Sequence, residues 1–192
     1  MTQFSLTPSQ TVGPFFAYAL TPADYQFSPL VGNDLVTADT EETPIRIQGK
    51  VLDGEGAPVT DAMIEIWQAD GNGIYAQPGS NKKFLGFGRC ETKDGVFSFR
   101  TVRPGPATGP DGRQMAPHIN VGIFARGLLL RLFTRIYFNG EPLNETDPIL
   151  SLVPQEARRT LIARRSGDSS GEPVYIFDIH LQGENETAFF EA

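Results

Sequence analysis

Short segments in which apolar and polar residues alternate recur along the chain, separated by turns rich in glycine and proline. In IRIQGKVLD (45–53), Ile45, Ile47, Gly49 and Val51 alternate with polar residues, a pattern typical of a half-buried strand. Further strands are predicted at AMIEIWQAD (62–70), FLGFGRCET (84–92), VFSFRTV (96–102), 118–125, 128–138 and VYIFDIHLQG (174–183). Short strands with little helix between them predict an all-β sandwich.

Two stretches add detail to this sandwich. Lys93, Asp94 and Gly95 separate two of the predicted strands and are typical of a turn, so we expect those strands to pair as a hairpin. In DPILSLVPQEARRTLIARR (147–165) the apolar residues instead follow roughly helical spacing, interrupted by Pro154. This predicts a short helical segment near 155–165, with the arginines of RRTLIARR on a solvated face.

The first 44 residues have no single period. The segment TPSQTVGPFFAYAL (7–20) combines prolines and a glycine with three aromatic side chains, and such rings must be buried against something. They could pack on the chain's own domain or on a partner. We therefore divide the chain into an irregular arm and loop, 1–44, and one sandwich domain, 45–192.

The charge balance and the cysteine count exclude several classes of function. With 16 Lys+Arg against 23 Asp+Glu, the net charge of −7 argues against nucleic acid as a partner. Cys90 is the one cysteine, so an internal disulfide is impossible and a plain buried thiol is expected. Neither a signal peptide nor a membrane span is predicted. These features together predict a cytoplasmic protein.

Candidate chemistry centres on His118 and Asn120. Residues two apart on a strand share a face, so His-x-Asn places an imidazole beside a carboxamide where His-x-His would make a metal-binding pair. His118 could be a ligand or a structural histidine. The other histidine, His180, shares the polar side of its strand with Asp178, and we expect it to face solvent and not a pocket.

Motifs typical of other catalytic sites are absent, but three arginines suggest binding. The sequence contains neither a G-x-S-x-G elbow nor a phosphate-binding G-x-x-x-x-G-K loop. Arg126, Arg131 and Arg135 are more suggestive, since the last two alternate with Phe133 and Tyr137 on one strand face. That face could bind a carboxylate, an aromatic ring or a partner chain, or it could be ordinary solvent surface.

Several of these motifs occur together in an order that resembles the intradiol ring-cleavage dioxygenases. They are GKVLDGEGAPVTDAMIEIWQADGNGIY, FLGFGRCETKDGVFSFRTVRPG, APHI and TRIYF. Marks of the α type of chain in this family are TPSQTVGP, MAPHIN, FARG and FDIHLQGENETAFF. The resemblance spans nearly the whole chain. It implies a β-sandwich enzyme whose ferric ion is held by two tyrosines and two histidines and activates a catechol for attack by O₂.

The resemblance also implies that this chain has lost half of that ligand set. The two tyrosine positions are Tyr75 and Ala107, and the two histidine positions are His118 and Asn120. Met115 stands where the catalytic chain carries an arginine. Phenolates are hard anions that suit Fe(III), so losing one should sharply lower the affinity for the metal. We expect the isolated chain to bind no catalytic iron and to be inactive.

In this family the α-type chain pairs with a homologous β chain, and the resemblance therefore implies a hetero-oligomer in which the arm and loop, 1–44, contact the partner chain. The β chain would hold Fe(III) and cleave protocatechuate with O₂ to 3-carboxy-cis,cis-muconate, on the β-ketoadipate route of aromatic degradation. The residues of this chain implied to line the shared substrate pocket are Thr11, Gly13, Pro14 and Arg126. The alternative is a transthyretin-like sandwich module that serves as a binding or scaffold domain without enzymatic role.

Overall fold

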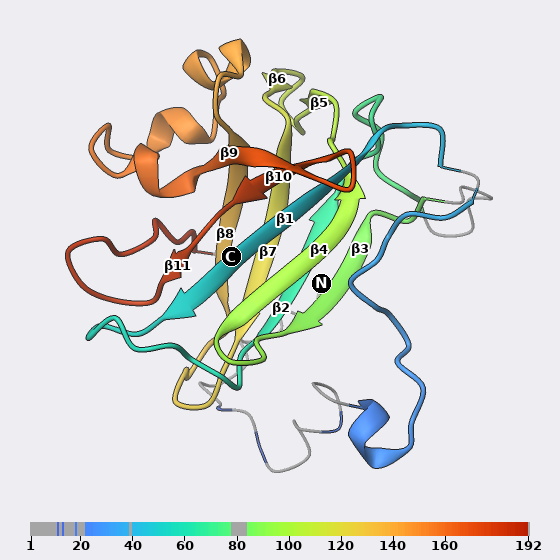
Figure 1. The fold of residues 1–192 in the computed structure, drawn as a ribbon. Coiled ribbons are helices and arrows are strands. Elements are labelled where there is room, and N and C mark those ends of the chain that lie inside the picture. Colours follow the sequence, from blue (N-terminus) through green and yellow to red (C-terminus); the bar gives the residue numbers. More distant parts are fainter. Residues whose placement is uncertain are drawn as a thin grey trace, which may run out of the picture.

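A nine-stranded β-sheet, folded into two layers that pack face to face, forms the body of the protein (Figure 1). The computed structural model describes residues 11, 13, 18, 22–38, 40–77 and 84–191. The strands are β1 (Pro44–Leu52), β2 (Met63–Gln68), β3 (Phe87–Glu91), β4 (Val96–Val102), β5 (Ala107–Thr108), β6 (Gln114–Met115), β7 (His118–Phe124), β8 (Leu132–Phe138), β9 (Ile162–Ser169), β10 (Glu172–Ile176) and β11 (Ile179–His180). Single 3-10 turns are η1 (Pro22–Tyr25), η2 (Pro142–Glu145), η3 (Leu150–Leu152) and η4 (Arg158–Leu161). The prediction of an all-β fold is confirmed.

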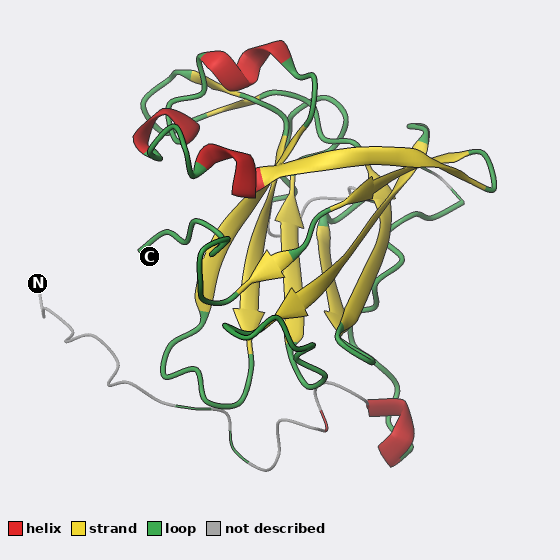
Figure 2. Cartoon of the chain, turned by 60° about the vertical axis from the view of Figure 1, so that its left-hand side comes forward, coloured by secondary structure: helices red, strands yellow, loops and turns green. Residues whose placement is uncertain are grey.

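One layer contains β4, β1, β10 and β9, and the other contains β3, β2, β7 and β8. Strand β9 pairs with β10 in the first layer and with β8 in the second, so it closes one side of the sandwich (Figures 1 and 2). The small β5–β6 ribbon lies at the end of the sandwich where β7 begins. Within the described part of the chain, no helix is long and apolar enough to cross a membrane.

The core lies between the layers and follows the alternation seen in the sequence. In β1 the side chains of Ile45, Ile47 and Val51 are buried, as the pattern predicted. At Gly49 an added Cβ would collide with the carbonyl oxygen of Phe177, so only glycine allows that backbone to approach β1. The main core includes the buried side chains of β1 together with Ile64, Ile66, Phe97, Phe99, Ile119, Val121, Ile123, Ile136 and Phe138.

The predicted hairpin between β3 and β4 is wrong. The turn itself forms, with Asp94 and Gly95 at φ 55° and 77°, but β3 pairs with β2 and β4 pairs with β1. The polar groups just before the turn bind elsewhere: the backbone N–H of Thr92 donates to Ala62, and its hydroxyl donates to Val59. The connection therefore crosses from one layer to the other.

Three predicted elements have different bounds. The segment 174–183 is interrupted between β10 and β11, because the carboxylate of Asp178 takes the place of a backbone acceptor for the N–H of Lys50. The strand predicted at 128–138 begins only at Leu132, since Gly127, at φ 84°, turns the chain first. The helical segment predicted near 155–165 is reduced to η4, and Arg164 and Arg165 lie on β9.

Residues 32–35, which precede β1, form a strap along the side of the sandwich opposite β9. The carbonyl of Gly32 accepts from Arg89 on β3, while Leu35 donates to and Asn33 accepts from Arg100 on β4. Leu35 itself is buried in the core. These residues pack on the chain's own domain, while a contact between the arm and a partner chain stays a prediction.

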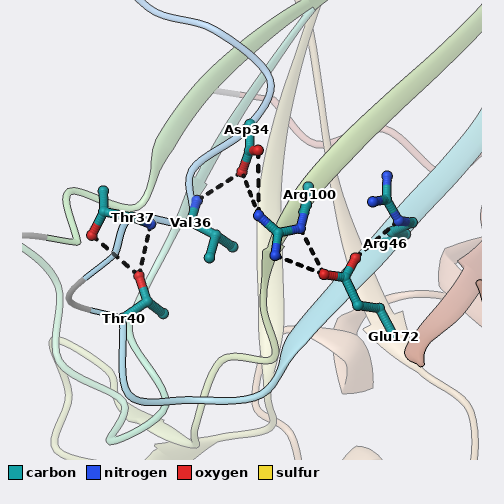
Figure 3. A network of polar contacts seen from close by, with 7 residues as sticks. All are labelled: Asp34, Val36, Thr37, Thr40, Arg46, Arg100 and Glu172. Carbon is teal, nitrogen blue, oxygen red and sulfur yellow. Dashed lines mark hydrogen bonds and ion pairs between the residues drawn. The ribbon is translucent and has the colours of Figure 1, made fainter. Parts of the chain in front are cut away.

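Charged side chains fasten this strap to the sheet (Figure 3). Arg100 lies 3.4 Å from the carboxylate of Asp34 and 2.7 Å from that of Glu172. Arg46, opposite Arg100 across β1 and β4, lies 2.9 Å from the other oxygen of Glu172. Glu172 thus separates two arginines that would otherwise repel each other on neighbouring strands.

Candidate functional site

The residues singled out on β7 lie where the pairing of three strands brings aromatic and polar side chains together. Asn120 is opposite Trp67 of β2 on one side and Arg135 of β8 on the other. His118 is opposite Tyr137 of β8, and their rings are 6.0 Å apart. Both His118 and Tyr137 are buried.

Tyr75 reaches this cluster from the loop that follows β2. The carboxylate of Asp70 accepts two backbone N–H groups of the turn, at 3.0 and 2.9 Å. Gly73, at φ 78°, lies so close to the carbonyl of Pro106 that any side chain there would collide with it. This packing directs Tyr75 over Trp67, with the two rings stacked at 5.8 Å.

The three polar side chains form one directed chain of hydrogen bonds. The carbonyl of Ala116, 2.7 Å from Nδ1 of His118, can only accept, so Nδ1 carries the imidazole proton. Nε2 then accepts from the Tyr75 hydroxyl at 3.0 Å. The Tyr75 oxygen accepts in turn from the amide of Asn120 at 3.1 Å. The cluster is therefore neutral, and both potential metal-binding atoms are engaged.

Burial and a nearby cation reinforce this neutrality. Burial lowers the pKa of His118 to about 4, with the positive charge of Arg135 adding to the effect. Burial also raises the pKa of the Tyr75 hydroxyl, and it raises the pKa of Tyr137 far above its ordinary value. Arg135 is half-buried, and its guanidinium donates to the sulfur of Met115 at 3.7 Å.

These residues do not fit a ferric ion. Tyr75 is kept as a phenol, Asn120 offers an amide, and Ala107 is a buried methyl group paired with Met115 in the β5–β6 ribbon. The charge of Arg135 further opposes a cation at this point. The described residues also contain no group of three His, Cys, Asp or Glu side chains that could hold a metal.

Asp147, which no sequence motif singled out, holds this end of the molecule together. Its side chain is fully buried and accepts from the N–H of Ala116 at 2.8 Å and from the hydroxyl of Tyr137 at 3.0 Å. It also accepts from the N–H groups of Ile149 and Leu150 at 2.9 and 2.7 Å. Asp147 lies directly before a proline, a combination that favours a turn but does not reveal a partner 31 residues earlier.

Arg126 lies at the opposite end of β7. With about 3.3 Å per residue in a strand, it is roughly 25 Å from His118. Its side chain is 78% exposed, and Nε donates to the carboxylate of Asp61. Its terminal nitrogens have no partner among the described residues, so they could bind a carboxylate in two-pronged fashion.

The predicted residues of the arm lie partly within the described chain. Thr11 is next to Arg126 in space, because its hydroxyl accepts from the N–H of Gly127 at 3.3 Å. Gly13 is exposed, while Pro14 lies outside the described residues. The structure thus brings Thr11 and Arg126 together but does not bring them near Tyr75 and His118.

The expectation that His180 faces open solvent is wrong. His180 is half-buried and lines a pocket of about 380 Å³. The C-terminal segment folds back over its strand, with Thr187 and His180 exchanging two hydrogen bonds of 3.0 Å, and thereby forms a wall. Cys90 is half-buried, and burial raises the pKa of its thiol, which makes it a poor nucleophile.

Comparison with known proteins assigns the chain and its fold to a family. Residues 12–183 match the model of a family described as dioxygenase. The protocatechuate 3,4-dioxygenase alpha chain of Burkholderia cepacia is 40% identical over the whole of both chains. The chain belongs to the intradiol ring-cleavage dioxygenase family. Its full-length match leaves the transthyretin-like alternative unsupported.

Two further matches, one to a relative and one to a solved structure, agree with this family. The beta chain of the same Burkholderia cepacia enzyme is 37% identical over 74% of this chain and 66% of its own length. The dioxygenase domain of a dioxygenase and carbohydrate-binding protein fusion from Streptomyces sp. SirexAA-E superposes with a TM-score of 0.64 at 29% identity, covering 96% of this chain and 100% of that domain. The predicted intradiol-type sandwich is thus confirmed.

Proposed function

We propose that this chain is the α subunit of a protocatechuate 3,4-dioxygenase. It pairs with an iron-bearing β subunit that cleaves protocatechuate with O₂ to 3-carboxy-cis,cis-muconate. The observation that carries the proposal is the 40% identity with an alpha chain along the full length. The neutral hydrogen-bonded cluster at Tyr75, His118 and Asn120 supports the division of labour, because it leaves this chain without a ferric site of its own.

In this proposal the Fe(III) belongs to the β subunit, where it activates the bound catechol. The α subunit supplies the other wall of the substrate pocket through its arm, 1–44, and through the turn after β7. Arg126 would bind the substrate carboxylate with its outward nitrogens while Asp61 holds Nε. Thr11, beside that turn, and Gly13 and Pro14 would shape the same wall.

The assembly we propose is a hetero-oligomer of α/β pairs. The aromatic part of the arm would then pack on the partner, while residues 32–35 of the same arm bind the chain's own sheets. We also propose a cytoplasmic location, in keeping with a single cysteine that remains a thiol.

Iron content and activity test the proposal. The purified chain alone should contain far less than one iron per chain and should not cleave protocatechuate. Co-expression with a β-type chain should give a coloured, active complex with about one iron per α/β pair. A variant of the β chain that lacks one iron-binding tyrosine should abolish both the colour and the activity of the complex. Stoichiometric iron and activity in the isolated α chain would overturn the proposal.

A further inference from the structure

The arginine-rich segment RRTLIARR has no part in the proposed function, and its four arginines divide into two pairs. Arg158 donates to the carbonyls of Val153 and Ser151, at 2.9 and 3.0 Å, and so fixes η4. Arg165 forms an ion pair of 2.8 Å with Asp168 on its own strand. Both of these side chains have evident structural partners.

The other two arginines, Arg159 and Arg164, have no carboxylate partner in the described ranges. The Arg159 side chain donates only to the side-chain oxygen of Asn185, at 3.2 Å, and the Arg164 side chain makes no hydrogen bond or ion pair with a described residue. The chain carries 23 acidic residues against 16 basic ones, so a cation without a carboxylate neighbour is not explained by a shortage of acids. Both arginines line the same pocket.

This pocket is the cavity of about 380 Å³ that His180 also lines. Its walls come from η4, from β9, from the β10–β11 segment and from residues 185–187. Asn185 and Thr187 add neutral polar groups, while Ile162 and Ile176 add apolar surface. The size and mixed lining suit a small organic molecule with separate charged and apolar parts.

The balance of charge in the pocket favours an anion. Asp178 is the one acidic residue among the described lining residues, and its Oδ1 already accepts from the backbone N–H of Lys50 at 2.9 Å. Arg159 and Arg164 therefore outnumber it. Guanidinium groups bind carboxylates with paired, charge-assisted hydrogen bonds, and two of them match two carboxylates joined by a short hydrocarbon chain.

We propose that this pocket binds a small dicarboxylate, with one carboxylate on Arg159, the other on Arg164 and the carbon chain over Ile162 and Ile176. The site is separate from the proposed substrate wall at Arg126, and it requires no iron. Its ligand would therefore be bound in addition to protocatechuate, by the α subunit alone.

The test uses the α/β complex and two matched probes, adipate and hexanoate, which share a six-carbon chain and differ by one carboxylate. Calorimetric titration should show adipate binding at one site per α chain, about tenfold tighter than hexanoate. Arg164→Gln and Arg159→Gln should each weaken adipate binding about tenfold, as expected for one lost charge-assisted contact. Arg164→Gln is the safer variant, because the exposed Arg164 side chain makes no hydrogen bond or ion pair with a described residue, while its backbone pairing with Ile176 is kept.

Arg165→Gln provides the control, since it removes the same charge from the neighbouring residue of β9, which does not line the pocket. Adipate affinity should change less than twofold in this variant and in Arg126→Gln. Equal weakening by Arg165→Gln would reduce the effect to general electrostatics and overturn the proposal. Absence of adipate binding to the unaltered complex would also overturn it. So would loss of the α/β complex in Arg164→Gln, which would show that the arginines bind a partner chain instead.

Discussion

The two ends of β7 have opposite characters. At its start, His118 is buried in a neutral chain of hydrogen bonds with Tyr75 and Asn120. Just beyond its last residue, Arg126 is exposed and charged, and only Nε is engaged among the contacts of the described residues. In the proposal above, the first end is the position of the family's metal site, and its potential ligand atoms bind one another instead. The second end has free donors but no catalytic group beside it.

If the proposed function holds, this contrast means that a subunit can lose its own reactive centre and still keep a part in the chemistry. With Ala107 and Asn120 at two of the proposed ligand positions, Tyr75 and His118 bind each other, and the cluster is part of the structure. Arg126 differs, because its side chain is exposed and only its Nε is engaged, by Asp61. The following variants separate the structural end from the binding end.

The strongest effect should come from the structural end, with Asp147→Ala. The change leaves three backbone N–H groups and the phenol of Tyr137 without their acceptor. We expect the free energy of unfolding to fall by about 4 kcal/mol. Urea denaturation measures it, with Asp111→Ala, at an exposed carboxylate, as a control that should change little. A loss below about 1 kcal/mol would contradict the role assigned to Asp147.

Acid should weaken the same end through His118. Its pKa in the folded chain, about 4, is below the ordinary 6.5. As the pH falls below 6.5, His118 is protonated in unfolded chains, but in folded chains it stays neutral until about pH 4. The free energy of unfolding therefore falls by about 3 kcal/mol between these pH values. Unfolding measured at pH 7 and pH 4 should show a smaller loss in His118→Gln. His180→Gln, which leaves His118 in place, should keep the full loss.

At the binding end, Arg126→Ala should change catalysis and not folding. In the α/β complex we expect KM for protocatechuate to rise about tenfold or more, for a lost charge-assisted contact of about 2 kcal/mol, with the iron content unchanged. Arg113→Ala, which breaks another exposed arginine–aspartate pair, is the matched control. Unchanged KM and kcat in Arg126→Ala would remove this residue from the substrate wall.

A weaker effect should follow Asp61→Asn, which loosens the hold on Arg126. Because the pair is exposed, KM should rise only about threefold, for less than about 1 kcal/mol. The rise should disappear when Arg126 is already alanine, since Asp61 would then have no guanidinium to hold. A threefold rise that persists in the double variant would show that Asp61 acts independently of Arg126.

Local patterns predicted the strands but not always their partners. The alternation in β1 is set by burial on one face, and it therefore appeared directly in the sequence. The turn at Asp94 and Gly95 was also predicted from the sequence. The hydrogen bonds of Thr92 to residues far away in the sequence, however, decide which layer each flanking strand joins. The same limit explains the long strand expected at 174–183, where alternation continues through the interruption at Asp178.

The site was harder to predict than the fold. The family resemblance placed Tyr75, Ala107, His118 and Asn120 at corresponding positions, whereas periodicity could only pair His118 with Asn120. Neither approach indicated Asp147, whose partners come from distant segments, or the wall that brings His180 into a pocket. Such long-range contacts depend on how loops return to the sheets, and loop paths leave little periodic signal.

The strap at residues 32–35 limits how the sandwich can meet other chains. A sheet edge with free N–H and C=O groups allows the addition of a foreign strand and, with it, aggregation. Here β3 and β4 are the outer strands on that side, and the strap bonds to both of them. On the opposite side, β9 joins the two layers. The flanks of the sandwich are thereby guarded against strand addition, which leaves its ends and faces as the surfaces for assembly.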